Sequence, residues 1–127
     1  MSFVARRIDH VEVLVGDLEA AARWYSRVLG LEEVARWDPE PVMISAGGTK
    51  LALFRASEPG ANANPQGQGR ARWHRVAFLT DEEGFATAQE HLRSLSIPFR
   101  GPVDHGLAWS IYFQDPDGNP LEITYYP

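Results

Sequence analysis

Residues 10–31 read HVEVLVGDLEAAARWYSRVLGL, and residues 74–97 read HRVAFLTDEEGFATAQEHLRSLSI. In the first stretch apolar residues alternate with others up to Val15, which is the period of a half-buried strand. From Asp17 onward the apolar residues recur at helical spacing, and Gly30 stands where a left-handed cap ends a helix. The second stretch repeats this order, with Asp81 in the place of Asp17. Because the two stretches superpose without gaps, we expect a duplicated strand–helix unit.

Further β-prone runs complete each half of the chain. The closing run GTKLALF aligns with GNPLEIT, which places Ala52 opposite Glu122. Each half then reads β-α-β-β-β, and the fold class is α+β, with two tandem modules whose sheets form a curved trough. We expect a single domain over residues 1–127, with modules at about 5–56 and 73–127 joined by a loop at 57–72 that is rich in Pro, Gly and Asn. The strands are expected at 8–15, 33–37, 42–46, 51–55, 73–79, 108–114 and 121–125.

The composition excludes several classes of protein. Of the 127 residues, 44% are hydrophobic and 23% are charged, as in an average water-soluble protein. The chain has no cysteine, so a disulfide framework, a zinc ribbon and a thiol nucleophile are excluded. A net charge of -5 argues against nucleic-acid binding, and no apolar stretch is long enough for a membrane span. We therefore expect a cytoplasmic protein that binds neither nucleic acid nor a membrane.

The repeat points to a metal site. If a pseudo-twofold axis relates the halves, His10 and His74 face each other across the trough. Glu122 alternates with the apolar residues Leu121 and Ile123, so its carboxylate points away from the helix. Two imidazoles and one carboxylate form a facial triad, which suits non-haem Fe(II) and also other divalent metals.

Three stretches resemble the vicinal oxygen chelate superfamily, which includes glyoxalases, fosfomycin and bleomycin resistance proteins and extradiol dioxygenases. They are DHVEVLVGDLEAAARWYSRVLGLE, WHRVAFLTDEEGFATAQEHL and WSIYFQDPDGNPLEI, and together they span most of the chain. The resemblance implies that His10, His74 and Glu122 bind a divalent metal, with Fe(II) first and Mn, Zn or Ni as alternatives. It also implies a homodimer whose pocket is completed by the second subunit.

Within this superfamily, DHGLAWSIYFQDPDGNPLE is most similar to the ring-cleaving extradiol dioxygenases. These enzymes have a His-Gly pair before the strand and a tyrosine ten residues before the glutamate ligand, which implies catalytic roles for His105 and Tyr112. Ala52 occupies the place of the fourth ligand of glyoxalase I. The acid–base histidine upstream of the second metal histidine has no counterpart between Arg55 and Trp73.

These features predict a metal-dependent enzyme, with Fe(II)-dependent cleavage of a catechol-type ring as the leading reaction. Glu12 shares a strand face with His10, and Ser110 shares one with Tyr112, so both are expected to contact the substrate. One alternative is a non-redox lyase, isomerase or thiol transferase that uses the metal as a Lewis acid. The other is a drug-binding protein of the bleomycin-resistance type that has no catalytic activity.

Overall fold

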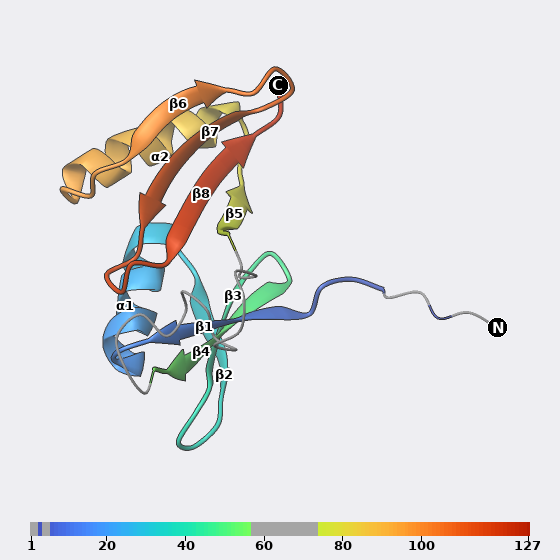
Figure 1. The fold of residues 1–127 in the computed structure, drawn as a ribbon, viewed down its shortest axis with the longest axis vertical. Coiled ribbons are helices and arrows are strands. Elements are labelled where there is room, and N and C mark those ends of the chain that lie inside the picture. The colour runs from blue at the N-terminus through green and yellow to red at the C-terminus, as the bar shows by residue number, and fades with distance from the viewer. Residues whose placement is uncertain (1–2, 4–5, 57–73) are drawn as a thin grey trace. The chain divides into compact units, whose positions relative to one another are not determined.

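The computed structural model describes residues 3, 6–56 and 74–127, in two units that are each treated by themselves: Met1–Asn62 and Ala63–Pro127 (Figure 1). The first unit contains β1 (His10–Val15), α1 (Leu18–Leu29), β2 (Glu32–Arg36), β3 (Val42–Ala46) and β4 (Thr49–Arg55). The second contains β5 (Val76–Leu79), α2 (Glu82–Ser94), β6 (Arg100–Asp104), β7 (Trp109–Gln114) and β8 (Pro120–Tyr125). The predicted α+β class with two β-α-β-β-β modules is confirmed. The predicted loop at 57–72 and Trp73 lie outside the described residues.

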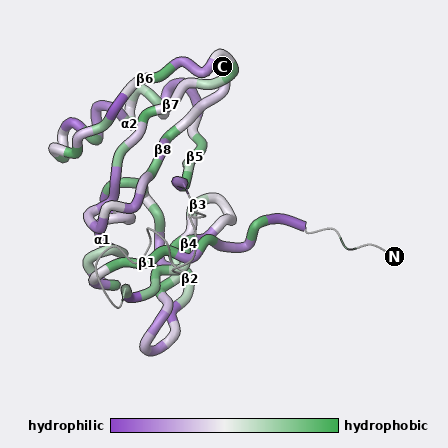
Figure 2. Tube along the Cα trace, in the orientation of Figure 1, coloured by the Kyte–Doolittle hydropathy of each residue, from purple (hydrophilic) through white to green (hydrophobic). Residues whose placement is uncertain are grey.

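The two sheets have the same topology. Their strand orders are β1-β4-β3-β2 and β5-β8-β7-β6. The first strand of each unit pairs in parallel with the last, and the other pairs are antiparallel. Each sheet packs one face on the helix of its unit. Hydropathy alternates along β7 and β8, whereas β3, β4 and β5 contain continuous apolar runs (Figure 2). We call the face turned away from the helix the front face.

Both helices begin at an aspartate that caps their first turn. The Asp17 carboxylate accepts a hydrogen bond from the Ala20 amide at 2.9 Å, and Asp81 accepts one from the Gly84 amide at 2.7 Å. Gly30 ends α1 with a φ of 72°, as the sequence predicts. The helices bury Ala21, Trp24, Tyr25 and Val28 from α1, and Phe85 and Leu92 from α2.

Strand β6 is the element that the sequence did not place. Gly101 has a φ of 112°, and a Cβ at this position would lie 2.8 Å from the Ser110 carbonyl oxygen, so glycine is required. A bulge follows from this backbone, because Arg100 pairs with Tyr112 while Val103 pairs with Ser110. The strand reads RGPVD, and its Gly, Pro and charged residues give neither an alternating pattern nor a β-prone apolar run.

A buried turn connects β7 to β8. Asp115 is 4% exposed, and its Oδ1 accepts hydrogen bonds from the amides of Asp117 and Asn119, each at 2.9 Å. The Asn119 side-chain amide donates to Asp115 Oδ2 at 2.7 Å. This turn fixes the register in which Tyr112 and Glu122 stand opposite each other.

Among the described residues, no helix is both long enough and apolar enough to span a bilayer.

Candidate functional site

On the front face of each sheet, one residue from each of the four strands lies in a row across the sheet. The rows of the two units occupy corresponding positions. In the first unit Ala52 pairs with Glu12 and Met43, and Met43 pairs with Ala35. The second unit has a charged and aromatic row in the same place. We call these the first row, which is Glu12–Ala52–Met43–Ala35, and the second row, which is Ala77–Glu122–Tyr112–Arg100.

His10 lies at the start of β1, two residues before the first row. Its Nδ1 is 2.9 Å from Asp9 Oδ2, and its Nε2 is 3.2 Å from Glu12 Oε2. The hydrogen bond to Asp9, and then that to Glu12, raises the pKa of His10 above its ordinary value. Lys50 Nζ lies 3.1 Å from the other Asp9 oxygen, and the hydrogen bonds from His10 and Lys50 lower the pKa of Asp9. Asp9, which sequence reasoning missed, thus orients the imidazole through Nδ1.

Glu122 is held by a buried hydroxyl group. Ser110 is 1% exposed, and its Oγ donates to Glu122 Oε2 at 2.7 Å. The same Oγ is 3.0 Å from Thr124 Oγ1, which donates to the Trp109 carbonyl oxygen at 2.9 Å. Ser110 has one hydroxyl proton, and the carboxylate is the shorter contact. Ser110 therefore positions Glu122, and its predicted contact with substrate stays a prediction.

The two residues that were expected to be catalytic meet in the second unit. His105 Nε2 and the Tyr112 phenolic oxygen are 2.5 Å apart, and the two rings meet edge-on with centroids 6.1 Å apart. The turn before β7 holds His105, whose amide donates to the Ala108 carbonyl at 2.8 Å. Either the imidazole or the phenol donates this hydrogen bond, depending on the tautomer of His105.

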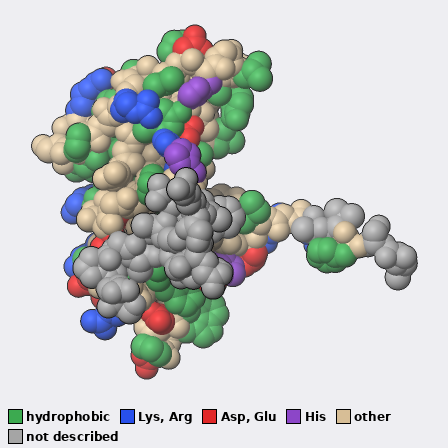
Figure 3. All heavy atoms as spheres, in the orientation of Figure 1, with side chains coloured by type: hydrophobic (Ala, Val, Ile, Leu, Met, Phe, Trp, Pro, Cys, Tyr) green, Lys and Arg blue, Asp and Glu red, His purple; other side chains and the backbone are tan. Residues whose placement is uncertain are grey.

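Two arginines that sequence reasoning missed also surround Tyr112. The guanidinium carbons of Arg75 and Arg100 each lie 4.4 Å from the centroid of the Tyr112 ring. Arg100 comes from the neighbouring strand β6, while Arg75 precedes β5 on the other side of β7. Basic and histidine side chains gather on this front face, which Figure 3 shows toward the viewer. Arg75 lies on the face of Glu122 because Ala77, two residues later, pairs with Glu122. The sequence alone does not reveal this pairing.

This pairing corrects the gap-free superposition of the two halves. Asp17 follows Glu12 by five residues, whereas Asp81 follows Ala77, the counterpart of Glu12 in the second row, by only four. The residue two positions before the row is therefore Arg75 in the second unit, where the first unit has His10. His74 precedes it, and Arg75 Nη2 donates to His74 Nε2 at 2.9 Å.

The predicted metal ligands are divided between the units, with His10 in the first and His74 and Glu122 in the second. Within the described part of either unit, no three His, Cys, Asp or Glu side chains are placed to hold a metal ion. The individual donors nevertheless suit a divalent metal. Asp9 bonds to Nδ1 of His10 and Ser110 to one oxygen of Glu122, so each ligand is oriented by a neighbour. Because Arg75 can only donate, Nε2 of His74 carries the lone pair that a metal would need.

Comparison with known proteins identifies the family. A family model described as the Glyoxalase/Bleomycin resistance protein/Dioxygenase superfamily matches residues 7–123. The chain is 30% identical over 126 residues to biphenyl-2,3-diol 1,2-dioxygenase 2 of Rhodococcus globerulus, covering 92% of this chain and 61% of that protein. It is 29% identical over 133 residues to virulence protein STM3117 of Salmonella typhimurium, covering 99% of this chain and 88% of that protein.

A solved structure gives the same result for the fold. The crystal structure of a glyoxalase/dioxygenase from Nostoc punctiforme matches with a TM-score of 0.81 and 26% identity, covering all of this chain and 98% of that chain. The chain spans about three fifths of the length of the Rhodococcus dioxygenase, at 61%. From residue 7 to residue 123, the chain belongs to the glyoxalase/bleomycin resistance protein/dioxygenase superfamily.

Proposed function

We propose that this chain is a metal-dependent extradiol dioxygenase that opens the ring of a catechol-type substrate. The observation that carries the proposal is the 2.5 Å contact between His105 and Tyr112, next to Glu122 in the second row. A phenol paired with an imidazole beside a carboxylate provides proton transfer next to a candidate metal ligand. The Rhodococcus relative, which is named as a dioxygenase of a biphenyl diol, supports this reaction over the others in the superfamily.

The proposed metal ligands are His10, His74 and Glu122, with Fe(II) as the metal. When bound, Fe(II) supplies Lewis acidity toward the two adjacent hydroxyl oxygens and electrons for the reaction with O2. Asp9 holds Nδ1 of His10, so the donor atom would be Nε2, which becomes available when Glu12 releases it, and Ser110 fixes the carboxylate of Glu122. His74 becomes available as a ligand when Arg75 releases its Nε2.

Tyr112 and His105 manage protons in this proposal. The Tyr112 oxygen accepts the proton of a substrate hydroxyl as its own proton passes to Nε2 of His105. His105 is exposed and can exchange that proton with water. Catechol and O2 then give a ring-opened product that contains both oxygen atoms. Glu12, which contacts His10, is proposed to bind the substrate from the first unit.

We also propose that the protein is a homodimer in which a second subunit completes the pocket. A monomeric mass from light scattering, measured for an active sample, would contradict this part alone.

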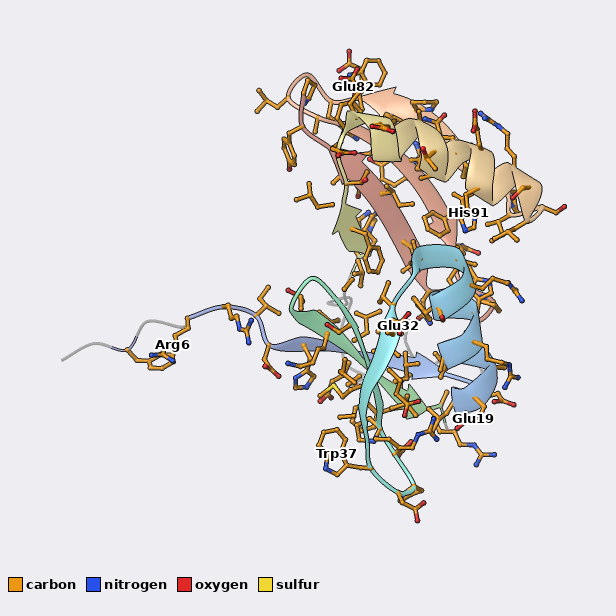
Figure 4. The ribbon with its side chains drawn as sticks, turned by 180° about the vertical axis from the view of Figure 1, so that it is seen from behind. Arg6, Glu19, Glu32, Trp37, Glu82 and His91 are labelled. Carbon is orange, nitrogen blue, oxygen red and sulfur yellow. The ribbon has the colours of Figure 1, made fainter. Side chains whose placement is uncertain are left out.

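The test combines metal content with O2 consumption. The full chain is purified without oxygen and loaded with Fe(II), and bound iron is measured by mass spectrometry for the parent protein and for Glu122→Ala. Glu82→Ala is the matched control, because Glu82 is an exposed glutamate at the start of α2 (Figure 4). We expect about one iron per chain in the parent and the control, and at least about 100-fold weaker binding in Glu122→Ala.

The same samples are then given a panel of catechols in an oxygen electrode. Consumption of O2 with a yellow product, lost in Glu122→Ala, is the expected result. Another bound divalent metal without O2 uptake would overturn the proposal in favour of a lyase, isomerase or thiol transferase. If no metal binds at all, the proposal fails and a drug-binding protein becomes the better assignment.

A further inference from the structure

Two positive charges converge on the ring of Tyr112. Each guanidinium carbon, of Arg75 and of Arg100, lies 4.4 Å from the centre of the Tyr112 ring. Over residues 3, 6–56 and 74–127, neither arginine forms an ion pair with an acidic side chain. Glu122, the acidic neighbour in the second row, takes its hydrogen bond from Ser110 instead. Their donors therefore face the front of the sheet with capacity for a ligand.

An arginine of the first unit shows the contrast. Arg36 is bound by Glu33 at 2.8 and 3.1 Å and also by Glu19, so its charge is compensated within the protein. At Tyr112 the aromatic ring takes the place of such partners, and a guanidinium stacked on a ring can still use its in-plane N–H donors. Of the Arg75 donors, Nη2 already contacts His74 Nε2 at 2.9 Å, and the others remain for a ligand. Arg75 and Arg100 approach the ring from opposite sides of β7, so an oxyanion at the ring could accept a hydrogen bond from each guanidinium.

We propose that Arg75 and Arg100 bind a carboxylate group of the ligand, on the front face of the second unit beside Tyr112. Two guanidinium groups and the one carboxylate of Glu122 leave a single net positive charge in the second row and its flank, which matches a monoanion. If the proposed function is correct, on which this extension rests, the substrate class is a catechol that carries a carboxylate on its ring.

Binding is tested first without metal and without turnover. Benzoate and benzamide, which have the same shape and differ in charge, are titrated into the metal-free full chain and followed by NMR or calorimetry. We expect benzoate to bind about tenfold or more tightly than benzamide, since hydrogen bonds to a charged group are the stronger ones. In Arg75→Gln and in Arg100→Gln this preference should fall by about tenfold.

The matched control is Arg93→Gln. Arg93 lies over the ring of Phe99, with its guanidinium carbon 5.2 Å from the ring centre, and belongs to α2 rather than to the second row. It should keep the preference of the parent protein, and circular dichroism should report the parent fold for all three variants. Equal affinity for benzoate and benzamide, or an unchanged preference in both Arg75→Gln and Arg100→Gln, would overturn the proposal.

Two further measurements identify the anion and separate this proposal from the dioxygenase. Tighter binding of phenyl phosphate than of benzoate would overturn the assignment to a carboxylate. Benzoate has no adjacent hydroxyl groups, so its binding does not depend on dioxygenase activity. Selective binding of benzoate without O2 uptake from 2,3-dihydroxybenzoate would therefore support the carboxylate site while the dioxygenase fails. Faster O2 uptake with unsubstituted catechol than with 2,3-dihydroxybenzoate would contradict the substrate class.

Discussion

The two units have the same topology, but the front faces of their sheets differ in chemistry. The first row, Glu12–Ala52–Met43–Ala35, has one charged residue, and that residue is on the strand at the edge. The second row, Ala77–Glu122–Tyr112–Arg100, has alanine at that edge and charged or aromatic side chains on the other three strands. The same sheet topology thus carries two chemically different front faces, while the face toward the helix is apolar in both units.

The largest expected effect tests whether the faces toward the helices are equivalent. Leu51 is 3% exposed, and Leu121, which aligns with it, is 1% exposed. We expect Leu51→Ala and Leu121→Ala each to lower the free energy of unfolding by about 2–5 kcal/mol, measured by urea denaturation. Leu107→Ala is the control, because Leu107 is 82% exposed. A loss in only one of the two buried variants would show that one helix face matters much less than the other.

The next effect separates the two edge strands, both of which contain a bulge. In β2 the extra residue is Val34, which is exposed and has no positive φ, whereas in β6 the bulge contains Gly101 with a φ of 112°. Gly101→Ala should therefore cost about 1–3 kcal/mol of unfolding free energy, whereas Val34→Ala should change it by less than about 0.5 kcal/mol. Thermal unfolding of both variants checks this, and similar shifts would mean that the two bulges are equivalent.

A third prediction concerns the guanidinium that contacts His74. Arg75 Nη2 donates to His74 Nε2 at 2.9 Å. Replacing Arg75 by a neutral residue frees the lone pair on His74 Nε2 and reduces the electrostatic repulsion of a metal cation bound there. Arg75→Gln should therefore bind divalent metal severalfold more tightly, as expected for about 1 kcal/mol of charge repulsion in water. Competition with a chelator measures the affinity, with Arg93→Gln as the control. Weaker metal binding would count against His74 as a ligand.

The helix caps should behave alike in both units. Asp17→Ala and Asp81→Ala each remove a side-chain acceptor from the first turn of a helix, and each should cost about 1 kcal/mol of unfolding free energy. Urea denaturation compares them, and Asp→Asn at each position, which keeps an acceptor, should restore most of the loss. A difference of more than about 1 kcal/mol between the two alanine variants would break the equivalence.

The smallest effect belongs to the first unit. Hydrogen bonds from Arg36 lower the pKa of Glu19 and of Glu33 below the ordinary value of 4.5. The resulting stabilisation is present above that value and is lost as the pH falls through the lowered pKa. Arg36→Gln should thus be slightly less stable than the parent at pH 7 and equal to it near pH 3, as measured by urea denaturation. Arg93→Gln should show no such pH dependence.

Most of the fold could be predicted from the sequence, because alternation along strands and spacing along helices follow directly from which face is buried. The caps at Asp17, Asp81 and Gly30 were placed correctly for the same reason. Strand β6 was not placed, since RGPVD gives neither an alternating pattern nor a β-prone apolar run.

The site was only partly predictable. The family resemblance implied His105 and Tyr112 separately, and the structure brings them into contact, although this contact was not predicted and their catalytic roles stay predictions. Arg75 and Arg100 were missed because their places depend on the register between strands, which is a property of the sheet rather than of any local stretch. The metal-binding roles of His10, His74 and Glu122 stay predictions.

The second row lies one residue nearer to its helix cap than the first row does, which has a consequence for how such proteins diverge. After a gene duplication, the loss or gain of a single codon between such a row and the helix cap shifts the preceding side chains of that strand to the opposite face. In this chain the shift decides whether His74 or Arg75 stands two residues before the second row on the face of Glu122. Selection can therefore exchange an imidazole for a guanidinium at a binding surface without substituting either residue.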